Sequence, residues 1–567
     1  MAARQPDRAA LKIPCGRTPR GDIDYLTLSF AELNTEVDAW STRLARAGVR
    51  RGDRTLVMVK QGLPLIASAF ALFKLGAVPI IIDPGMGLRN FLRCVERSRP
   101  RALVGIPLAQ LVSRVFGRPF STVAARVTAS SSLTARLTTS IPPLSVLGSQ
   151  LAQSAPTDLA AVLFTSGSTG APKGVCYEHG MFDAQIRLIR DTYAIEPGEV
   201  DLPMLPIFAL FNPALGMTTI VPEIDPRRPA TVDPRKIVQA ITQENVTNSF
   251  GSPTLWRKIG DHCIAHQITL PSLRRVLCAG APVPETLWQS SRTWMPRGGL
   301  HSPYGATEAL PVTTISSDEI AALSVASVPF GSAFGSCVGR PIAGNQLKII
   351  TIVDQPIESL DDIRELPNGE IGEIIVAGPT VTRTYDAAPE ATSLAKIEMP
   401  NAKCQAPARP VGASDTSENW SVEFGVSAPR GTVWHRMGDC GYLDPQGRLW
   451  FCGRKVERVE TAQGTLFTEP CEQAFRCHPH VTRCALIGLG KPGQQRPAIV
   501  VEAGPGNSNT YPGFARELRA LALRQPHTAG ITLFYFHPKF PVDVRHNAKI
   551  HRLALAHWAI SVQGFEG

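Results

Sequence analysis

Short apolar runs of strand character alternate with helical patterns through residues 25–350 of this chain. Stretches between the runs, such as 30–47, space their apolar residues as amphipathic helices do. This alternation favours α/β layers built on mainly parallel sheets, because each parallel crossover is usually made by a helix. The clearest buried strands are predicted at 56–59, 78–82, 103–106 and 159–164.

The length of 567 residues exceeds what one hydrophobic core usually supports, so two or more domains are expected. We predict a large N-terminal domain of layered β-sheets and helices, residues 1–452. A small, mobile C-terminal α+β domain is predicted for residues 453–567. Residues 107–156 are rich in Ser, Thr and Arg, and we interpret them as a partly ordered surface excursion. Residues 386–431 have weak periodicity, and we interpret them as an inserted loop.

One segment predicts a phosphate-binding loop. Residues 163–174 read Leu-Phe-Thr-Ser-Gly-Ser-Thr-Gly-Ala-Pro-Lys-Gly and follow a strand-like run. Glycines allow several backbone N–H groups to face one anion, and hydroxyls and a lysine add donors. The spacing is not that of a Walker loop. The candidate ATP-binding residues here are Thr165, Ser166, Gly167, Ser168, Thr169, Gly170 and Lys173.

Further motifs follow this loop in a fixed order: Ala-Gly-Ala-Pro at 279–282, Tyr-Gly-Ala-Thr-Glu at 304–308, Met-Gly-Asp at 437–439 and Gly-Arg at 453–454. Together with the loop they resemble the adenylate-forming superfamily, which includes acyl-CoA ligases, luciferases and the adenylation domains of peptide synthetases. The resemblance extends over nearly the whole chain. It implies ATP and Mg²⁺ as cofactors.

The resemblance also implies a role for individual residues. Tyr304 would stack on adenine, Thr307 would contact the α-phosphate and Glu308 would hold Mg²⁺, a hard cation that prefers oxygen ligands. A point charge at Lys549 would support the transfer between two oxyanions. The remaining implied contacts are Gly280, Ala281, Pro282 and Gly305 near adenine, Asp439 on the ribose hydroxyls and Arg454 near ribose or phosphate.

Three segments are similar to a narrower group, the β-lactone synthetases of bacterial long-chain olefin biosynthesis: residues 433–439, 449–455 and 545–549. This similarity implies a 2-alkyl-3-hydroxy fatty acid as substrate and enzymes of an olefin pathway as partners. The acid would be adenylated, and its own 3-hydroxyl would then close a four-membered ring. The base for that hydroxyl is not identified by sequence, and the nominees are His435, His546 and His301.

Two alternatives stay open at this point: a long-chain acyl-CoA or acyl-carrier ligase, and a non-catalytic acyl- or nucleotide-binding protein. Val456 departs from the hinge pattern of the superfamily, which puts CoA-dependent domain rotation in doubt. The apolar segment 205–213 is the natural wall of an acyl pocket, with Phe208 and Phe211 as candidate lining residues.

The net charge of +10 does not predict a nucleic-acid partner, because the basic residues are interpreted as scattered and form no basic helix. An anionic substrate or an anionic membrane surface fits the charge as well. The apolar run 63–82 is broken at Lys74, Gly76 and Pro79, which favours a buried helix and strand over a membrane span. With no signal segment recognised, a cytoplasmic location is expected, and peripheral membrane association is left open.

Overall fold

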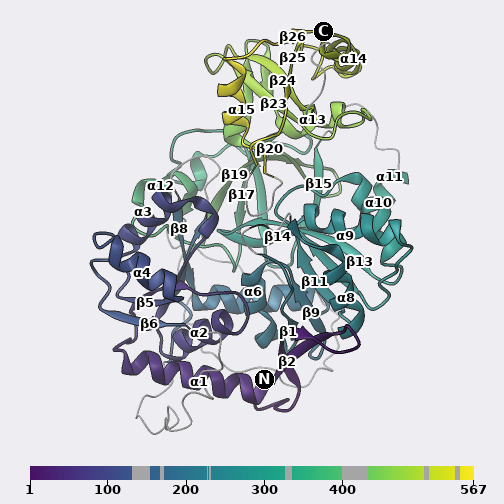
Figure 1. Cartoon of the computed structure of the whole chain (residues 1–567). Helices are drawn as coiled ribbons and strands as arrows, with labels where there is room; N and C mark the ends of the chain where they lie inside the picture. Colours follow the sequence, from purple (N-terminus) through teal and green to yellow (C-terminus); the bar gives the residue numbers. More distant parts are fainter. Residues whose placement is uncertain are drawn as a thin grey trace, which may run out of the picture.

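The structure is a computed structural model that describes residues 1–129, 153–165, 172–225, 228, 231–325, 335–398, 432–503, 510–542 and 549–567 (Figure 1). Two sheets with flanking helices form the large body of the molecule. A smaller unit from the C-terminal part of the chain sits at the top of the view.

The first large sheet has six strands in the order β6-β5-β3-β4-β7-β8, and all neighbours are parallel except β7 and β8. The four predicted buried strands are four of its members, so that prediction is confirmed. The strands are β3 (Arg54–Met58), β4 (Val78–Ile82), β5 (Ala102–Gly105), β6 (Ala125–Thr128), β7 (Leu159–Thr165) and β8 (Lys173–Glu178).

Helices cover both faces of this sheet. The apolar run 63–82 folds into helix α2 (Leu63–Lys74) and strand β4, as predicted from its interruptions. Residues 107–129 correct the sequence interpretation, because they form α4 (Pro107–Val115) and the sheet strand β6 rather than a surface excursion. Residues 130–152 lie outside the described part. The other helices of this region are α1 (Phe30–Arg46) and α3 (Leu88–Ser98).

The second sheet has 14 strands and runs through the order β16-β17-β19-β20-β15-β14-β13-β12-β11-β9-β10-β1-β2, with β18 paired to β19. Its strands β9 to β13 are parallel, with helices between them, whereas β14 to β20 are antiparallel. Its strands are β1 (Ala9–Arg17), β2 (Ile23–Ser29), β9 (Val200–Pro203), β10 (Thr218–Ile220), β11 (Asn248–Gly251), β12 (Arg275–Cys278), β13 (Gly299–Ala306), β14 (Ala309–Ser316), β15 (Ser336–Pro341), β16 (Gln346–Ile350), β17 (Gly372–Ala377), β18 (Lys396–Glu398), β19 (Val433–Leu443) and β20 (Leu449–Arg454).

The main core cluster of this sheet packs its parallel strands against three helices, with Trp256 and Trp294 stacked in parallel 5.5 Å apart. Burial of such large apolar side chains is the dominant stabilising contribution in folding. These three helices are α8 (Pro234–Glu244), α9 (Pro253–Ala265) and α10 (Glu285–Trp294). The other helices of this region are α6 (His179–Tyr193), α7 (Asn212–Leu215) and α11 (Ser317–Val325).

The C-terminal unit has its own hydrophobic clusters, and no buried member of them precedes Val459 among the described residues. Sequence patterns predict strands at 483–488, 498–502 and 531–535 and a helix at 512–523. All four are present, with starts and ends within two residues of these bounds. The elements are β21 (Val459–Thr461), β22 (Gly464–Leu466), α13 (Thr468–Arg476), β23 (Cys484–Leu489), β24 (Arg496–Glu502), α14 (Tyr511–Ala522), β25 (Leu533–His537), α15 (Arg552–Ala559) and β26 (Phe565–Glu566). The mobility of this unit and its boundary after residue 452 stay predictions.

In the described parts of the chain, no helix combines the length and the apolar character that crossing a bilayer would require.

Candidate functional site

Thr307 and Glu308 form the two-residue turn between β13 and β14, and three side chains fix this turn. The Tyr177 hydroxyl donates to the carbonyl oxygen of Thr307. The backbone N–H and the Oγ1 hydroxyl of Thr382 both donate to the carbonyl oxygen of Glu308, at 2.8 and 3.1 Å. The Tyr385 hydroxyl donates to Glu308 Oε1 at 2.8 Å. The Glu308 carboxylate is therefore held in one orientation before any ligand arrives.

Gly305 precedes this turn at an irregularity in the strand register. A Cβ atom at this position would lie 2.5 Å from the carbonyl oxygen of Ala309. Only glycine allows the two strands to approach this closely and so to bring Tyr304 and Glu308 into the same site.

A buried carboxylate, Asp439, joins β19 to the β13 hairpin. It pairs across strands with Arg454, whose Nη1 lies 2.9 Å from Asp439 Oδ1, and the Tyr304 hydroxyl donates to Oδ2 at 2.7 Å. Burial raises the pKa of Asp439, and the positive charge of Arg454 opposes that rise. Gly438, with φ +66°, makes the local turn in β19 that presents the carboxylate. The structure thus brings together three residues that sequence placed in the nucleotide site.

Lys173 opens β8, and its backbone pairs with that of Thr165 at the end of β7. The Lys173 ammonium group lies 5.0 Å from the centre of the Tyr385 ring, beside the turn that carries Glu308. The start of β8, and with it the end of β7, therefore lies near the turn that carries Glu308. Ser166, Gly167, Ser168, Thr169 and Gly170 lie outside the described residues, so their predicted contacts with phosphate stay predictions.

Sequence reasoning missed Lys396, which lies in the segment interpreted as a loop. Residues 389–398 instead form α12 (Pro389–Ala395) and β18, and β18 adds to β19 with Lys396 opposite His435. Lys396 is 5% exposed and donates to Thr382 Oγ1 at 3.1 Å. Its Nζ also lies 5.8 Å from the Tyr385 ring centre. Both residues that position Glu308 are therefore held by one buried lysine, which no local motif identifies.

Burial lowers the pKa of Lys396 to about 7, whereas an exposed lysine has a pKa of about 10.4. Between these values the unfolded chain binds a proton that the folded protein does not, so the wild-type free energy of unfolding rises with pH. Lys396→Met removes this titration. We therefore expect the wild type to gain stability over the variant as pH rises from 7 to 10, by up to about 1.4 kcal/mol per pH unit.

Chemical denaturation of both proteins across this pH range measures the effect. Lys236→Met, at an exposed position, is the matched control and should give a difference that does not change with pH. A Lys396→Met difference that is constant with pH would show that the lysine is not desolvated as the structure places it.

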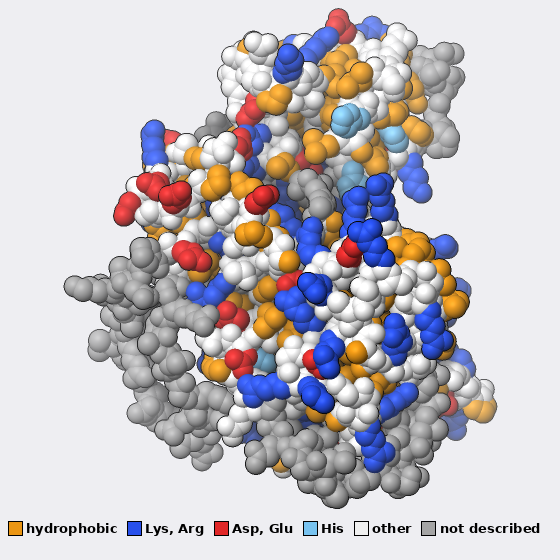
Figure 2. Space-filling view, turned by 90° about the vertical axis from the view of Figure 1, so that its left-hand side faces the viewer, with side chains coloured by type: hydrophobic (Ala, Val, Ile, Leu, Met, Phe, Trp, Pro, Cys, Tyr) orange, Lys and Arg blue, Asp and Glu red, His pale blue; other side chains and the backbone are white. Residues whose placement is uncertain are grey.

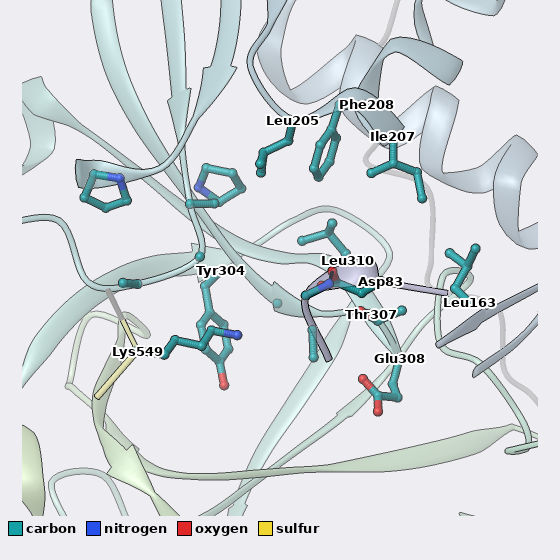
Figure 3. A pocket seen from close by; sticks show the side chains of 18 of the residues that line it. Asp83, Leu163, Leu205, Ile207, Phe208, Tyr304, Thr307, Glu308, Leu310 and Lys549 are labelled. Carbon is teal, nitrogen blue, oxygen red and sulfur yellow. Dashed lines mark hydrogen bonds between the residues drawn. The ribbon is translucent and has the colours of Figure 1, made fainter. Parts of the chain in front are cut away.

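Lys549 lines the same cavity and lies beside Tyr304 (Figure 3). Two features hold the chain next to it. The following residue forms an isolated bridge with Val542. Arg552 pairs with Glu472 through Nε at 2.7 Å and with Glu457 through Nη1 at 2.9 Å. These ion pairs, also missed by sequence, tie the segment that carries Lys549 to the segment that follows Arg454.

The cavity has a volume of about 3650 Å³ and combines the polar groups above with an apolar wall. Ordinary ligand pockets measure about 300–1,000 Å³, so this space accommodates a nucleotide and a long alkyl chain together. Phe208 and Phe211 line it, and Phe208 stacks on Phe250 with ring centres 3.7 Å apart. Their role in binding an acyl chain stays a prediction. Figure 3 shows Leu205, Ile207 and Phe208 opposite the Lys549 side of the cavity. The turn of Gly280, Ala281 and Pro282 also lines it.

One of the three nominated histidines, His435, lines this cavity. Its Nδ1 lies 3.1 Å from the carbonyl oxygen of Ala395, and burial holds its pKa well below the usual value. A neutral ring that donates from Nδ1 leaves Nε2 as a proton acceptor. His301 packs edge-on against Tyr193, and His546 lies outside the described residues.

Comparison with known proteins adds to this geometry. Residues 1–386 match the family described as AMP-binding enzyme. The chain is 44% identical to the olefin β-lactone synthetase of Xanthomonas campestris and 42% identical to that of Stenotrophomonas maltophilia, in each case over 99% of this chain and 96% of the relative. The o-succinylbenzoate-CoA synthetase of Bacillus subtilis, solved with ATP and a magnesium ion, has the same fold, with a TM-score of 0.70, 19% identity and 98% coverage of both chains.

Proposed function

The chain belongs to the family of AMP-binding enzymes, and on that premise we propose that it is an ATP-dependent β-lactone synthetase acting on a 2-alkyl-3-hydroxy fatty acid. The observation that carries this proposal is the cavity in which Glu308, Asp439 and Lys549 face an apolar wall. Polar groups at one end suit ATP, and the apolar wall suits alkyl chains.

In the first step, a carboxylate oxygen of the fatty acid attacks the α-phosphorus of ATP. The bond from that phosphorus to the bridging oxygen breaks, and pyrophosphate leaves with the electron pair. Asp439 orients the nucleotide by accepting hydrogen bonds from the ribose hydroxyls. Lys549 places positive charge between the carboxylate and the phosphate, where it is most effective in the transition state.

In the second step, the 3-hydroxyl oxygen attacks the acyl carbon of the adenylate. The bond between that carbon and the AMP oxygen breaks, AMP leaves, and the hydroxyl proton passes to a base. The nucleophile is already part of the substrate, and such intramolecular reactions reach effective molarities of about 10⁵–10⁸ M. Strain in the four-membered ring offsets part of this advantage.

The residues present fit a Mg²⁺ ion that accompanies ATP. Glu308 presents a carboxylate with Oε1 already held by Tyr385, and hard oxygen donors of this kind suit Mg²⁺ together with phosphate oxygens. When bound, the ion would neutralise charge on the phosphates. Lys173 would add a second positive charge on the same side of the site.

The rival assignment is a long-chain acyl-CoA or acyl-carrier ligase, and the hinge distinguishes the two. Val456 is 46% exposed at the position where the superfamily has a polar residue, and Glu457 beside it is bound to Arg552. This ion pair stabilises the domain arrangement in which Lys549 lies in the site. It therefore favours a reaction in which both steps occur without rotation of the small domain. The retention of Lys173, Glu308, Asp439 and Lys549 argues against a non-catalytic binding protein. We also propose that this protein contacts the enzymes that supply the hydroxy acid or consume the lactone.

CoA should therefore be unnecessary for turnover. Enzyme incubated with ATP, Mg²⁺ and a 2-alkyl-3-hydroxy acid should release one AMP for each lactone formed, and CoA should not raise the rate. A matched acid without the 3-hydroxyl should be adenylated and then stall, because no nucleophile attacks the adenylate. NMR of the products and an AMP assay measure both outcomes.

The two reactions give opposite results in this experiment. If the acid without the hydroxyl, supplied with CoA, yields acyl-CoA at a rate comparable to turnover of the hydroxy acid, the ligase assignment replaces the lactone assignment. Adenylation of neither acid would place the substrate in another class.

A further inference from the structure

The positive charge of this protein is concentrated in one segment, contrary to the scattered distribution interpreted from sequence. Residues 84–129 contain eight arginines and one acidic residue, Glu96. This segment alone has a net charge of +7, out of +10 for the whole chain. It includes α3 and α4, so α3 is a basic helix that the sequence interpretation overlooked.

Helices α3 and α4 lie on the same face of the six-stranded sheet. Phe91 and Val95 of α3 belong to one core cluster, and Val112 of α4 packs against that cluster. Arg118, just after α4, also pairs with Glu96 of α3 at 3.0 Å. The side chains on the outer surfaces of the two helices therefore form one continuous surface, which we call the α3–α4 face.

This face exposes large apolar side chains. Leu108, Leu111 and Val115 of α4 are 62%, 57% and 67% exposed, and Leu88 at the start of α3 is 54% exposed. The α4 residues are spaced three and four apart, so they form one stripe along the helix. Contiguous apolar side chains on a surface mark an interaction site more often than isolated ones do.

Exposed arginines accompany this stripe. Arg89, Arg93 and Arg114 are exposed, and within the described residues no carboxylate pairs with any of them. Figure 2 looks onto this side of the molecule and shows Lys and Arg side chains interspersed with apolar ones. Because no carboxylate in the described part of the chain neutralises these guanidinium groups, they are available to an anionic partner.

We propose that the α3–α4 face docks this protein on the surface of a bilayer rich in anionic phospholipid. Leu108, Leu111 and Val115 would enter the boundary between headgroups and acyl chains, and the arginines would bind lipid phosphates. Helices with a basic face and an exposed leucine stripe lie at this depth in a membrane interface. A nucleic acid would match the charge but would gain nothing from the exposed leucines.

The position of the cavity agrees with this partner. Leu88, Leu108 and Val112 also line the cavity that contains Tyr304 and Lys549. The cavity thus reaches from the α3–α4 face to the site, which gives a long-chain acid dissolved in the bilayer a route to the site. This last step rests on the proposed function, whereas the docking itself does not.

The test is co-sedimentation of the full chain with vesicles, in the absence of ATP and substrate. Vesicles of phosphatidylglycerol and phosphatidylethanolamine should sediment the wild type, and vesicles of phosphatidylcholine should not. The triple variant Arg89→Gln/Arg93→Gln/Arg114→Gln should lose on the order of 100-fold in partitioning, at about fivefold per charge. Leu108→Gln/Leu111→Gln should also weaken binding, and added salt should weaken the wild type.

The matched control is Arg274→Gln/Arg297→Gln/Arg364→Gln, which removes the same charge at exposed positions elsewhere in the chain. It should bind vesicles as the wild type does, and thermal unfolding checks that both triple variants fold. The docking proposal would be overturned if the control variant lost as much vesicle binding, because binding would then depend on the net charge of the protein and not on this face. Equal binding to both lipid mixtures, or binding to neither, would also overturn the proposal. If the protein is retained on immobilised polyglutamate but does not bind vesicles, the partner of this face is an acidic protein and the proposal is likewise overturned.

Discussion

Replacing Lys549 by alanine should slow formation of the acyl-adenylate on the order of 10²–10³-fold, with little change in the KM for ATP. The lysine is proposed to stabilise negative charge that builds up between the carboxylate and the α-phosphate only in the transition state. A group of this kind contributes to kcat more than to ground-state binding. Pyrophosphate release under saturating ATP and fatty acid measures the change directly.

The fold should survive this substitution, because the local chain is held by other contacts. Arg552 pairs with Glu457 and Glu472 independently of the Lys549 side chain. Lys539→Ala, an exposed lysine in the same C-terminal unit, is the matched control and should keep wild-type activity. Pyrophosphate release from Lys549→Ala at the wild-type rate would remove this lysine from the mechanism.

The parts of the fold that sequence predicts well are those with strong local patterns. The buried strands of the six-stranded sheet are short, apolar and bounded by turn residues, and the break at Gly76 separates α2 from β4. The regular elements in segments 107–129 and 389–398 are not predicted from sequence. Strand β18, for example, has three residues and exists because β19 offers a free edge to pair with. Pairing of that kind depends on distant residues and leaves little periodicity in the local sequence.

The residues of the candidate site also fall into two groups, those in recognisable motifs and those outside any motif. Tyr304, Glu308 and Asp439 stand in motifs, and the structure brings them to one cavity. Lys396 and Arg552 stand in no motif, and their positions follow from long-range pairing with Thr382 and Glu472. Sequence shows which residue types the chemistry needs, whereas the side chains that hold them in place are identified only by the fold.

The arginines of the α3–α4 face are a different case, since the sequence contained the signal. The count of eight arginines against one acidic residue needs no structure. What sequence could not supply was the α4 helix, which aligns Leu108, Leu111 and Val115 on its exposed side. An excess of positive charge does not by itself distinguish a membrane from a nucleic acid. The distinction requires knowing which apolar side chains lie on the same surface.

Asp439→Asn should raise the KM for ATP on the order of 10²-fold or more. The carboxylate is proposed to accept two hydrogen bonds from the ribose, and hydrogen bonds to a charged group contribute about 1.5–3 kcal/mol each. The amide keeps the shape of the side chain but lacks the charge and replaces one acceptor by a donor. Arg454 would also lose its partner, and a broken ion pair of this kind costs up to about 3–5 kcal/mol when fully buried, less here because the Arg454 side chain is 32% exposed.

Asp444→Asn separates the loss of binding from the loss of stability. Asp444 ends the same stretch of chain, is 7% exposed and is held by Arg448 at 2.5 Å and by the Trp450 indole N–H at 3.0 Å. Its substitution should lower the melting temperature as the Asp439 variant does, but it should leave the KM for ATP unchanged. Thermal unfolding with and without ATP and a titration of pyrophosphate release against ATP distinguish the two. Equal KM values in both variants would mean that ATP binds elsewhere, because the Asp439 carboxylate would then not contact the ribose.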